Sequence, residues 1–173
     1  MWLWIAFGII FAVGFVAFTG APYVPSKRRD VRRALTELYP LSDKDVLIDI
    51  GSGDGIVLRE ASRLGAKAIG YEIHPVLVAI SRLLSRNDER VTTKLANFWS
   101  VDLPRATTVV YTFGEGRDIT KMYQKVQSEA ERLGHSIAFI TYGFDVPGIK
   151  PQLSVGAHHL YTIEPLQGQG ITV

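Results

Sequence analysis

Asp49 stands two positions before the first of three alternating glycines, Gly51, Gly53 and Gly55. Glycines let the backbone approach a ligand closely, and the start of a following helix favours negative charge. A dinucleotide fingerprint would need glycine where Ile56 stands, so the spacing disfavours a nicotinamide oxidoreductase. A carboxylate at Asp49 would repel a pyrophosphate but would accept hydrogen bonds from an ammonium group. The turn therefore favours a ligand with an amine and no phosphate.

A second acid, Glu72, lies at the end of the next predicted strand. A carboxylate at this place in an α/β sheet can accept the hydrogens of two ribose hydroxyls. A ligand with an ammonium group and a ribose, but without phosphate, matches S-adenosyl-L-methionine. The alternative is a structural turn with solvated carboxylates. The turn and the two acids together predict S-adenosyl-L-methionine as the cofactor, and no group of residues has metal-ligand spacing.

Alternating strands and helices must position these residues. The apolar strand Val46–Ile50 precedes the glycine turn, and a helix from about Ile56 to Leu64 follows it. This alternation predicts an α/β fold with a mostly parallel sheet and helices on both faces. The later elements are expected as strands over 66–72, 91–95, 107–113 and 136–142, helices over 76–86 and 119–133, and a final antiparallel pair over 153–155 and 160–163.

The first 19 residues carry no charge, and the basic stretch Lys27–Arg33 follows them closely. A helix of this length spans about 28 Å, close to the thickness of the bilayer hydrocarbon. The basic flank predicts by the positive-inside rule that the rest of the chain stays in the cytoplasm. A signal peptide or a core helix is the alternative, but no basic residue precedes the apolar run and apolar residues cover every face. We therefore expect a single-pass membrane protein anchored through residues 1–19.

Length and composition support one compact domain behind this anchor. We divide the chain into an anchor over 1–19, a linker and helix over 20–40, and a cofactor-binding domain over 41–173. The absence of cysteine excludes disulfides and thiolate chemistry, and a net charge of +2 does not indicate a nucleic-acid partner. RNA remains an alternative reading of the basic stretch, although contact with lipid headgroups explains it better.

Asp49–Gly55 and Tyr71–Pro75 resemble the motifs of seven-strand (class I) S-adenosylmethionine-dependent methyltransferases. An apolar N-terminal segment, then 21–26, then the glycine turn is an order similar to that of the ATP synthase c-subunit lysine N-methyltransferase family and its prokaryotic relatives. The resemblance implies a Rossmann-like methyltransferase sheet with antiparallel C-terminal strands. It implies cofactor contacts at Asp49, Gly51, Ser52, Gly53, Gly55, Glu72 and Ile73, with Asn97 and Phe98 at the adenine.

Methyl transfer to a lysine requires a neutral amine held in line with the methyl group, so aromatic and acidic side chains near the fourth strand end are candidates. For two of them a non-catalytic interpretation remains open. Tyr111 also fits a core residue on an alternating strand, and Glu115 also fits a solvated loop acid. Trp99 lines the adenine pocket or fills the core. The catalytic candidates are Tyr23, Ser26, Tyr111, Phe113 and Glu115.

The leading hypothesis is a membrane-anchored protein-lysine N-methyltransferase that acts on a membrane-embedded protein. An anchor would confine enzyme and substrate to one surface and so raise their effective concentration. Two alternatives remain: methylation of a lipid or small molecule, and a module that binds the cofactor without turnover. We expect no nucleic-acid partner.

Overall fold

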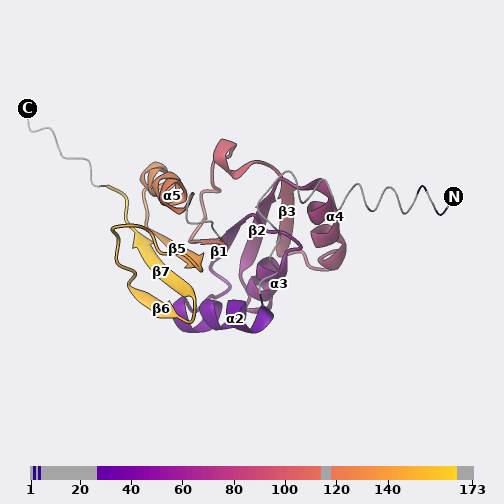
Figure 1. Ribbon diagram of the computed structural model, residues 1–173, viewed down its shortest axis with the longest axis horizontal. Coiled ribbons are helices and arrows are strands. Elements are labelled where there is room, and N and C mark those ends of the chain that lie inside the picture. Colours follow the sequence, from indigo (N-terminus) through magenta and orange to yellow (C-terminus); the bar gives the residue numbers. More distant parts are fainter. Residues whose placement is uncertain (1, 3, 5–26, 114–117, 167–173) are drawn as a thin grey trace, which may run out of the picture.

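The computed structural model describes residues 2, 4, 27–113 and 118–166, which form a seven-stranded sheet with helices on both sides (Figure 1). In chain order its elements are α2 (Arg28–Arg33), the π-helical turn η1 (Ala34–Leu38), β1 (Val46–Ile50), α3 (Ile56–Arg63), β2 (Lys67–Glu72), α4 (Pro75–Leu84), β3 (Val91–Leu95), the 3₁₀ turn η2 (Phe98–Ser100), β4 (Val109–Thr112), α5 (Ile119–Leu133), β5 (Ile137–Tyr142), β6 (Leu153–Val155) and β7 (His158–Ile163).

The strand order is β3-β2-β1-β4-β5-β7-β6. The first five strands in this order run parallel, and β7 and β6 are antiparallel to their neighbours. The predicted mostly parallel sheet with antiparallel C-terminal strands is thus confirmed. The order reverses between β1 and β4, and ligands of open α/β sheets bind outside the carboxyl ends of the strands at such a switch point. The topology therefore directs attention to the segments after β1, β2 and β4.

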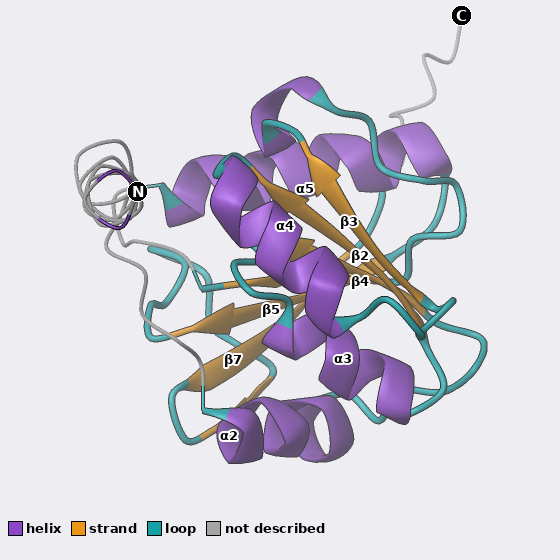
Figure 2. Cartoon of the chain, turned by 90° about the vertical axis from the view of Figure 1, so that its right-hand side faces the viewer, coloured by secondary structure: helices purple, strands orange, loops and turns teal. Residues whose placement is uncertain are grey.

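Each face of the sheet has its own hydrophobic core, because successive side chains of a strand point to opposite faces. On one face α2, η1 and α3 cover strand residues that include Leu47 and Tyr111. On the other face α5 covers residues that include Ile48 and Phe139. Figure 2 shows α3 and α4 side by side along the sheet.

The predicted elements agree with the structure except at their ends. β1 has the predicted bounds, but β4 is shorter than the predicted strand over 107–113. Its start is delayed because the Thr107 amide donates to the Pro104 carbonyl (3.0 Å) in a turn. β7 begins earlier than expected, at His158, because this residue pairs with Tyr142 at the end of β5.

The expected apolar stripe on the segment before β1 is buried. Val31, Ala34, Leu35 and Leu38 all pack into the core on the α3 side of the sheet. The helical segment ends at Leu38, two residues before Pro40. A proline disfavours helical backbone in the residue before it, which explains the position of this end.

The prediction of a membrane-spanning helix, and with it that of a single-pass membrane protein, is wrong by the test that the structure provides. None of the helices in the described residues is long and apolar enough to cross a bilayer. The longest, α5, has 15 residues, which gives about 22 Å. The hydrocarbon core measures about 30 Å. Residues 5–19, on which most of the prediction fell, lie outside the described part of the chain.

Candidate functional site

The glycines of the turn after β1 all adopt left-handed backbone conformations, and two of them serve different purposes. A Cβ atom on Gly51, at φ +69°, would meet nothing within 4 Å. A Cβ atom on Gly55, at φ +81°, would lie 2.2 Å from the Ser81 hydroxyl oxygen on α4. The space beside Gly51 at the carboxyl end of β1 is therefore open, and we call the region at the ends of β1, β2 and β4 the crevice. Gly55 instead allows α3 and α4 to approach each other.

The Glu72 carboxylate joins the two turns at the ends of β1 and β2. One of its oxygens accepts the Gly53 amide hydrogen at 2.9 Å, and the other accepts that of His74 at 2.9 Å. The side chain is 5% exposed. Each carboxylate oxygen can accept a further hydrogen bond, so Glu72 retains the capacity to bind a pair of hydroxyl groups.

Asp49, at the end of β1, is a buried acid with only 3% exposure. Burial raises the pKa of its carboxyl well above the usual value, and the negative charges of Glu72 and Asp54 raise that pKa further. No ion pair involves Asp49 within the described residues. A ligand cation beside this carboxylate would favour the charged form and so relieve the cost of burying it.

Ser52 and Ile73 differ in how they face this crevice. The Ser52 hydroxyl points at β2, since a Cβ atom on Gly70 would lie 2.3 Å from it, so only the backbone of Ser52 is available to a ligand. Ile73 directly follows Glu72 and is 55% exposed. An apolar side chain left in solvent beside the Glu72 carboxylate is suited to contact the flat face of a base.

The segment after β3 separates the two predicted adenine contacts. The Asn97 side chain accepts the Trp99 amide hydrogen at 3.1 Å and so caps η2. Phe98 is buried in the core on the α5 side, with the Lys125 ammonium 5.5 Å from its ring centre. Trp99 is exposed, and its ring meets that of Phe98 edge-on at 5.6 Å. The Phe98 side chain therefore packs in the core, and it is less accessible to a ligand than the exposed Trp99.

The end of β4 carries one exposed aromatic residue among the predicted catalytic candidates. Phe113 is 37% exposed, and its ring lies 4.8 Å from that of Tyr142 at the end of β5. Both residues lie at the carboxyl edge of the sheet, beside the switch point. The other candidates Tyr23, Ser26 and Glu115 fall outside the described residues.

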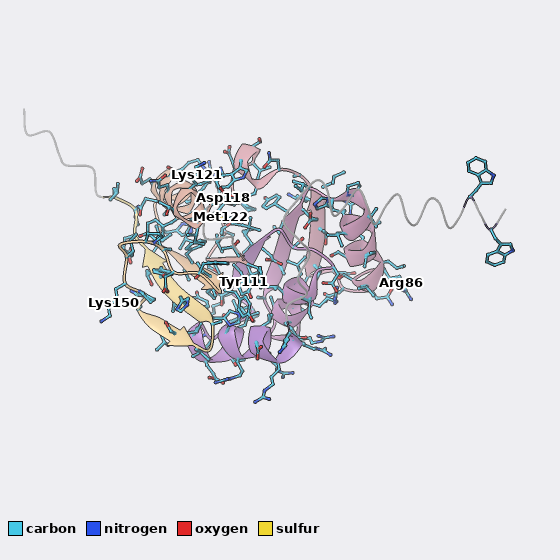
Figure 3. All side chains as sticks on the ribbon, in the orientation of Figure 1. Arg86, Tyr111, Asp118, Lys121, Met122 and Lys150 are labelled. Carbon is cyan, nitrogen blue, oxygen red and sulfur yellow. The ribbon has the colours of Figure 1, made fainter. Side chains whose placement is uncertain are left out.

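Tyr111 points into the molecule rather than into the crevice. It is 1% exposed and belongs to the core on the α3 side (Figure 3). Its hydroxyl lies 2.9 Å from the His158 Nε2 atom on β7. Tyr111 is therefore a core residue, as the alternative interpretation of the sequence predicted. Its hydrogen bond connects β4 to β7.

His158 and Tyr142 form a polar cluster that the sequence reasoning did not assign to the site. His158 is 2% exposed, and its ring centre lies 4.6 Å from that of Tyr142. Burial lowers its pKa from 6.5 to about 4, against the opposing charge of Asp30, so the ring is neutral near neutral pH. The only sequence signal was the His158–His159 alternation, which predicts that one of the two faces inward.

The part of the chain that matches a known protein family includes the candidate site. The family described as the ANTKMT methyltransferase domain matches residues 49–153, from Asp49 in β1 to the start of β6. The ATP synthase c-subunit lysine N-methyltransferase of Xenopus laevis is 32% identical over 120 residues, which cover 68% of this chain and 52% of that protein. The chain belongs to the ANTKMT methyltransferase domain family. The family resemblance inferred from the motifs is thus confirmed.

Two further proteins resemble this chain over most of its length. A protein-lysine N-methyltransferase of Saccharolobus islandicus (strain REY15A) is 28% identical over 150 residues, covering 76% of this chain and 81% of that one. A solved RNA methyltransferase of Salinibacter ruber, in complex with S-adenosyl-L-homocysteine, superimposes with a TM-score of 0.70 and 27% identity. It covers 83% of this chain and 95% of its own.

The extent of these matches differs between relatives. The chain spans about half the length of the Xenopus laevis and Rattus norvegicus relatives, 52% and 51% respectively. It also superimposes on an S-adenosylmethionine-dependent methyltransferase of Thiobacillus denitrificans with a TM-score of 0.56 at 16% identity, covering 76% of this chain and 54% of that one. At that identity the likeness concerns the fold.

Proposed function

We propose that this chain is an S-adenosylmethionine-dependent protein-lysine N-methyltransferase. The observation that carries the proposal is the match over residues 49–153, which includes both acids of the crevice and the end of β4. Two relatives that cover two thirds or more of this chain are named as lysine N-methyltransferases. The chemistry of the crevice agrees with this activity.

The residues around the β1–β4 switch point suit the cofactor. The buried Asp49 carboxylate would receive the ammonium group, and Glu72 would receive the ribose hydroxyls. Ile73 would contact the adenine. The open space beside Gly51 would let the ligand lie close to the backbone of the glycine turn. S-adenosylmethionine supplies an activated methyl group, so the protein's task is to bind, orient and exclude water.

The acceptor amine must be neutral, because an ammonium ion has no lone pair for the transfer. An apolar surrounding lowers the pKa of a lysine and so favours the neutral form. Phe113 and Tyr142 would supply this surrounding at the strand ends, with Tyr111 and His158 holding Tyr142 in position from behind. Tyr23, Ser26 and Glu115 stay candidates for orienting the amine.

The c-subunit of the ATP synthase is the first substrate that we propose to test. The Xenopus laevis and Caenorhabditis elegans relatives are named for this protein. The Saccharolobus islandicus relative is named for protein lysine without a stated target. Other lysine-bearing proteins therefore belong in the same assay.

RNA is the second candidate acceptor, because the Salinibacter ruber structure is an RNA methyltransferase that this chain covers almost completely. The basic stretch on α2 is the feature that would bind RNA phosphates. Part of its charge is already neutralised, since Arg28 pairs with the buried Glu60 and Arg33 pairs with Glu37 at 3.0 Å. We therefore place a protein acceptor first.

The proposal is tested by incubating the full chain with methyl-labelled S-adenosylmethionine and four acceptor pools. These are the purified ATP synthase c-subunit, a whole protein extract, total RNA and a lipid extract. We expect label in protein, recovered after acid hydrolysis as ε-N-methyl-lysine. A Glu72→Ala variant is the matched negative control, and Glu131→Gln, an exposed acid on α5, is the positive one.

The other outcomes separate the alternatives. Label only in RNA would replace the proposal with an RNA methyltransferase, and label only in the lipid extract would indicate a lipid acceptor. Binding of the cofactor in calorimetry without label in any pool would favour a non-catalytic module. Label in protein on residues other than lysine would contradict the proposed acceptor.

A further inference from the structure

A pocket of about 150 Å³ lies between α2 and the turn that joins β6 to β7. It is separate from the residues assigned to the cofactor. Its lining residues are Asp30, Arg33, Tyr142, Val155, Gly156, Ala157 and His158. Three segments far apart in the sequence therefore build one concave site.

The pocket adjoins the end of β4 at which the methyl transfer is proposed. Tyr142 lines the pocket and also stacks on Phe113, with 4.8 Å between ring centres. His158 forms part of the wall behind it, 4.6 Å from Tyr142 between ring centres. A side chain that enters from α2 and passes Tyr142 would thus arrive at Phe113, on the carboxyl edge of the sheet.

The charged side chains that line the pocket are Asp30 and Arg33, and with the Glu37 partner of Arg33 they leave one negative charge. Arg33 is engaged by Glu37 through two hydrogen bonds of 3.0 and 3.1 Å, so this pair contributes no net charge. His158 is neutral near neutral pH. Asp30 remains as one negative charge, and no ion pair involves it in the part of the chain that the structure describes. A carboxylate ligand would meet Asp30 instead of a free arginine.

The shape and polarity of the wall suit a long, thin side chain. Val155 and Ala157 provide apolar surface, and the Tyr142 ring can contact both methylene groups and an ammonium group. Lysine has this construction, a compact charge on a flexible four-carbon stem.

We propose that this pocket admits the acceptor lysine of the substrate protein, with Asp30 as the residue that captures its ammonium group. The inference rests on the proposed lysine methyltransferase function and assigns its acceptor subsite. Asp30 acts in recognition, because a carboxylate stabilises the charged amine. The neutral wall of Tyr142 and His158 lies deeper and favours the uncharged amine that accepts the methyl group.

A titration of the full chain with n-butylammonium tests the pocket without any need for turnover. The probe has the length and charge of a lysine side chain, and n-butyrate of equal length has the opposite charge. We expect saturable shifts of the Gly156 and Ala157 amide resonances with n-butylammonium and none with n-butyrate. Asp30→Asn should weaken binding about tenfold, the scale of one hydrogen bond to a charged group. Asp43→Asn, a matched loss of charge at an exposed site, should leave binding unchanged.

Several results would overturn the proposal that this pocket binds a lysine side chain. They are equal shifts with n-butyrate, the absence of saturable shifts at Gly156 and Ala157, or an Asp30→Asn titration that matches the wild type. Steady-state kinetics with a lysine peptide that the wild type methylates gives the second measurement: Asp30→Asn should raise KM for the peptide about tenfold with an unchanged Kd for S-adenosylmethionine. Asp30→Glu should restore most of the loss. A wild-type chain that methylates no protein lysine would overturn the proposed function, while the titration still judges the pocket by itself.

Discussion

The two sides of the crevice are built differently. The proposed cofactor side consists of the Asp49–Gly55 turn and Glu72, and backbone amides hold it together through a carboxylate. The proposed acceptor side consists of Tyr111, Phe113, Tyr142 and His158, and ring contacts and one side-chain hydrogen bond hold it together. Polar backbone geometry defines the first side, and aromatic packing across three strands defines the second.

This difference explains how each side should respond to mutation. The cofactor side depends on a few residues with strict backbone requirements, so single changes there should abolish binding. The acceptor side spreads its geometry over many contacts, so single changes should reduce stability or turnover in smaller steps. Substitutions on the two sides test this contrast, from the largest expected effect to the smallest.

Replacing Glu72 should have the largest effect on the cofactor side. Glu72→Ala removes the acceptor of the Gly53 and His74 amides and also the proposed ribose contact. We expect the affinity for S-adenosylmethionine to fall about 1,000-fold, equivalent to about 4 kcal/mol. Calorimetry measures this, with Glu131→Gln as the control. A loss of less than tenfold would show that Glu72 only joins the two turns.

Alanine at two glycines should separate ligand access from packing. Gly55→Ala combines the cost of positive φ with a clash at Ser81 and should reduce the free energy of unfolding by about 3 kcal/mol. Gly51→Ala has no clash and should reduce the free energy of unfolding by about 1 kcal/mol. It should weaken cofactor binding more than Gly55→Ala does. Denaturant unfolding and calorimetry measure both quantities. Equal stability losses for the two variants would contradict the distinction.

The buried histidine should make the acceptor side sensitive to acid. Folding lowers the pKa of His158 from 6.5 to about 4, so the unfolded chain takes up the proton first as the pH falls. The stability that its neutral form allows is fully present above the unfolded pKa and is lost toward pH 4. Between about pH 7 and about pH 4.5 the wild type should lose about 2 kcal/mol more than His158→Gln. Parallel loss in both chains would contradict a neutral buried ring.

The smallest effect is expected at Tyr111. Tyr111→Phe keeps the ring in the core and removes the hydroxyl that lies 2.9 Å from His158 Nε2. We expect a loss of about 1 kcal/mol in the free energy of unfolding, with cofactor affinity unchanged. Turnover should fall only severalfold if Tyr111 acts by positioning. A complete loss of turnover with intact cofactor binding would instead make Tyr111 catalytic.

The alternation of strands and helices around the glycine turn could be predicted because its signals are local. The Val46–Ile50 strand, the glycine turn and Glu72 stand close together in the sequence, and an apolar strand followed by a glycine turn is a local strand-to-helix signal. The packing of Phe98 in the core was harder to foresee, since a single aromatic residue suits a ligand pocket and a core equally well.

The acceptor side could not be predicted because it depends on long-range pairing. His158 meets Tyr111 and Tyr142 only through the antiparallel register of β5 and β7, which no local pattern specifies. Asp30 joins them through the packing of α2 against the far end of the sheet. The membrane-spanning helix was predicted from the length and apolarity of residues 1–19 and from their basic flank, and the described helices do not include one.

The central claim is that the crevice binds an ammonium-bearing cofactor through a buried carboxylate. Its most direct test is calorimetric titration of S-adenosyl-L-homocysteine into the wild type and Asp49→Asn, with nicotinamide adenine dinucleotide as the comparison ligand. We predict binding by the wild type, a loss of about 100-fold in Asp49→Asn, and no heat with the dinucleotide. The ligand-free variant should unfold at an equal or higher temperature, since burial raises the pKa of Asp49 and its charge costs stability. Equal affinity of both chains, or binding of the dinucleotide, would contradict the account.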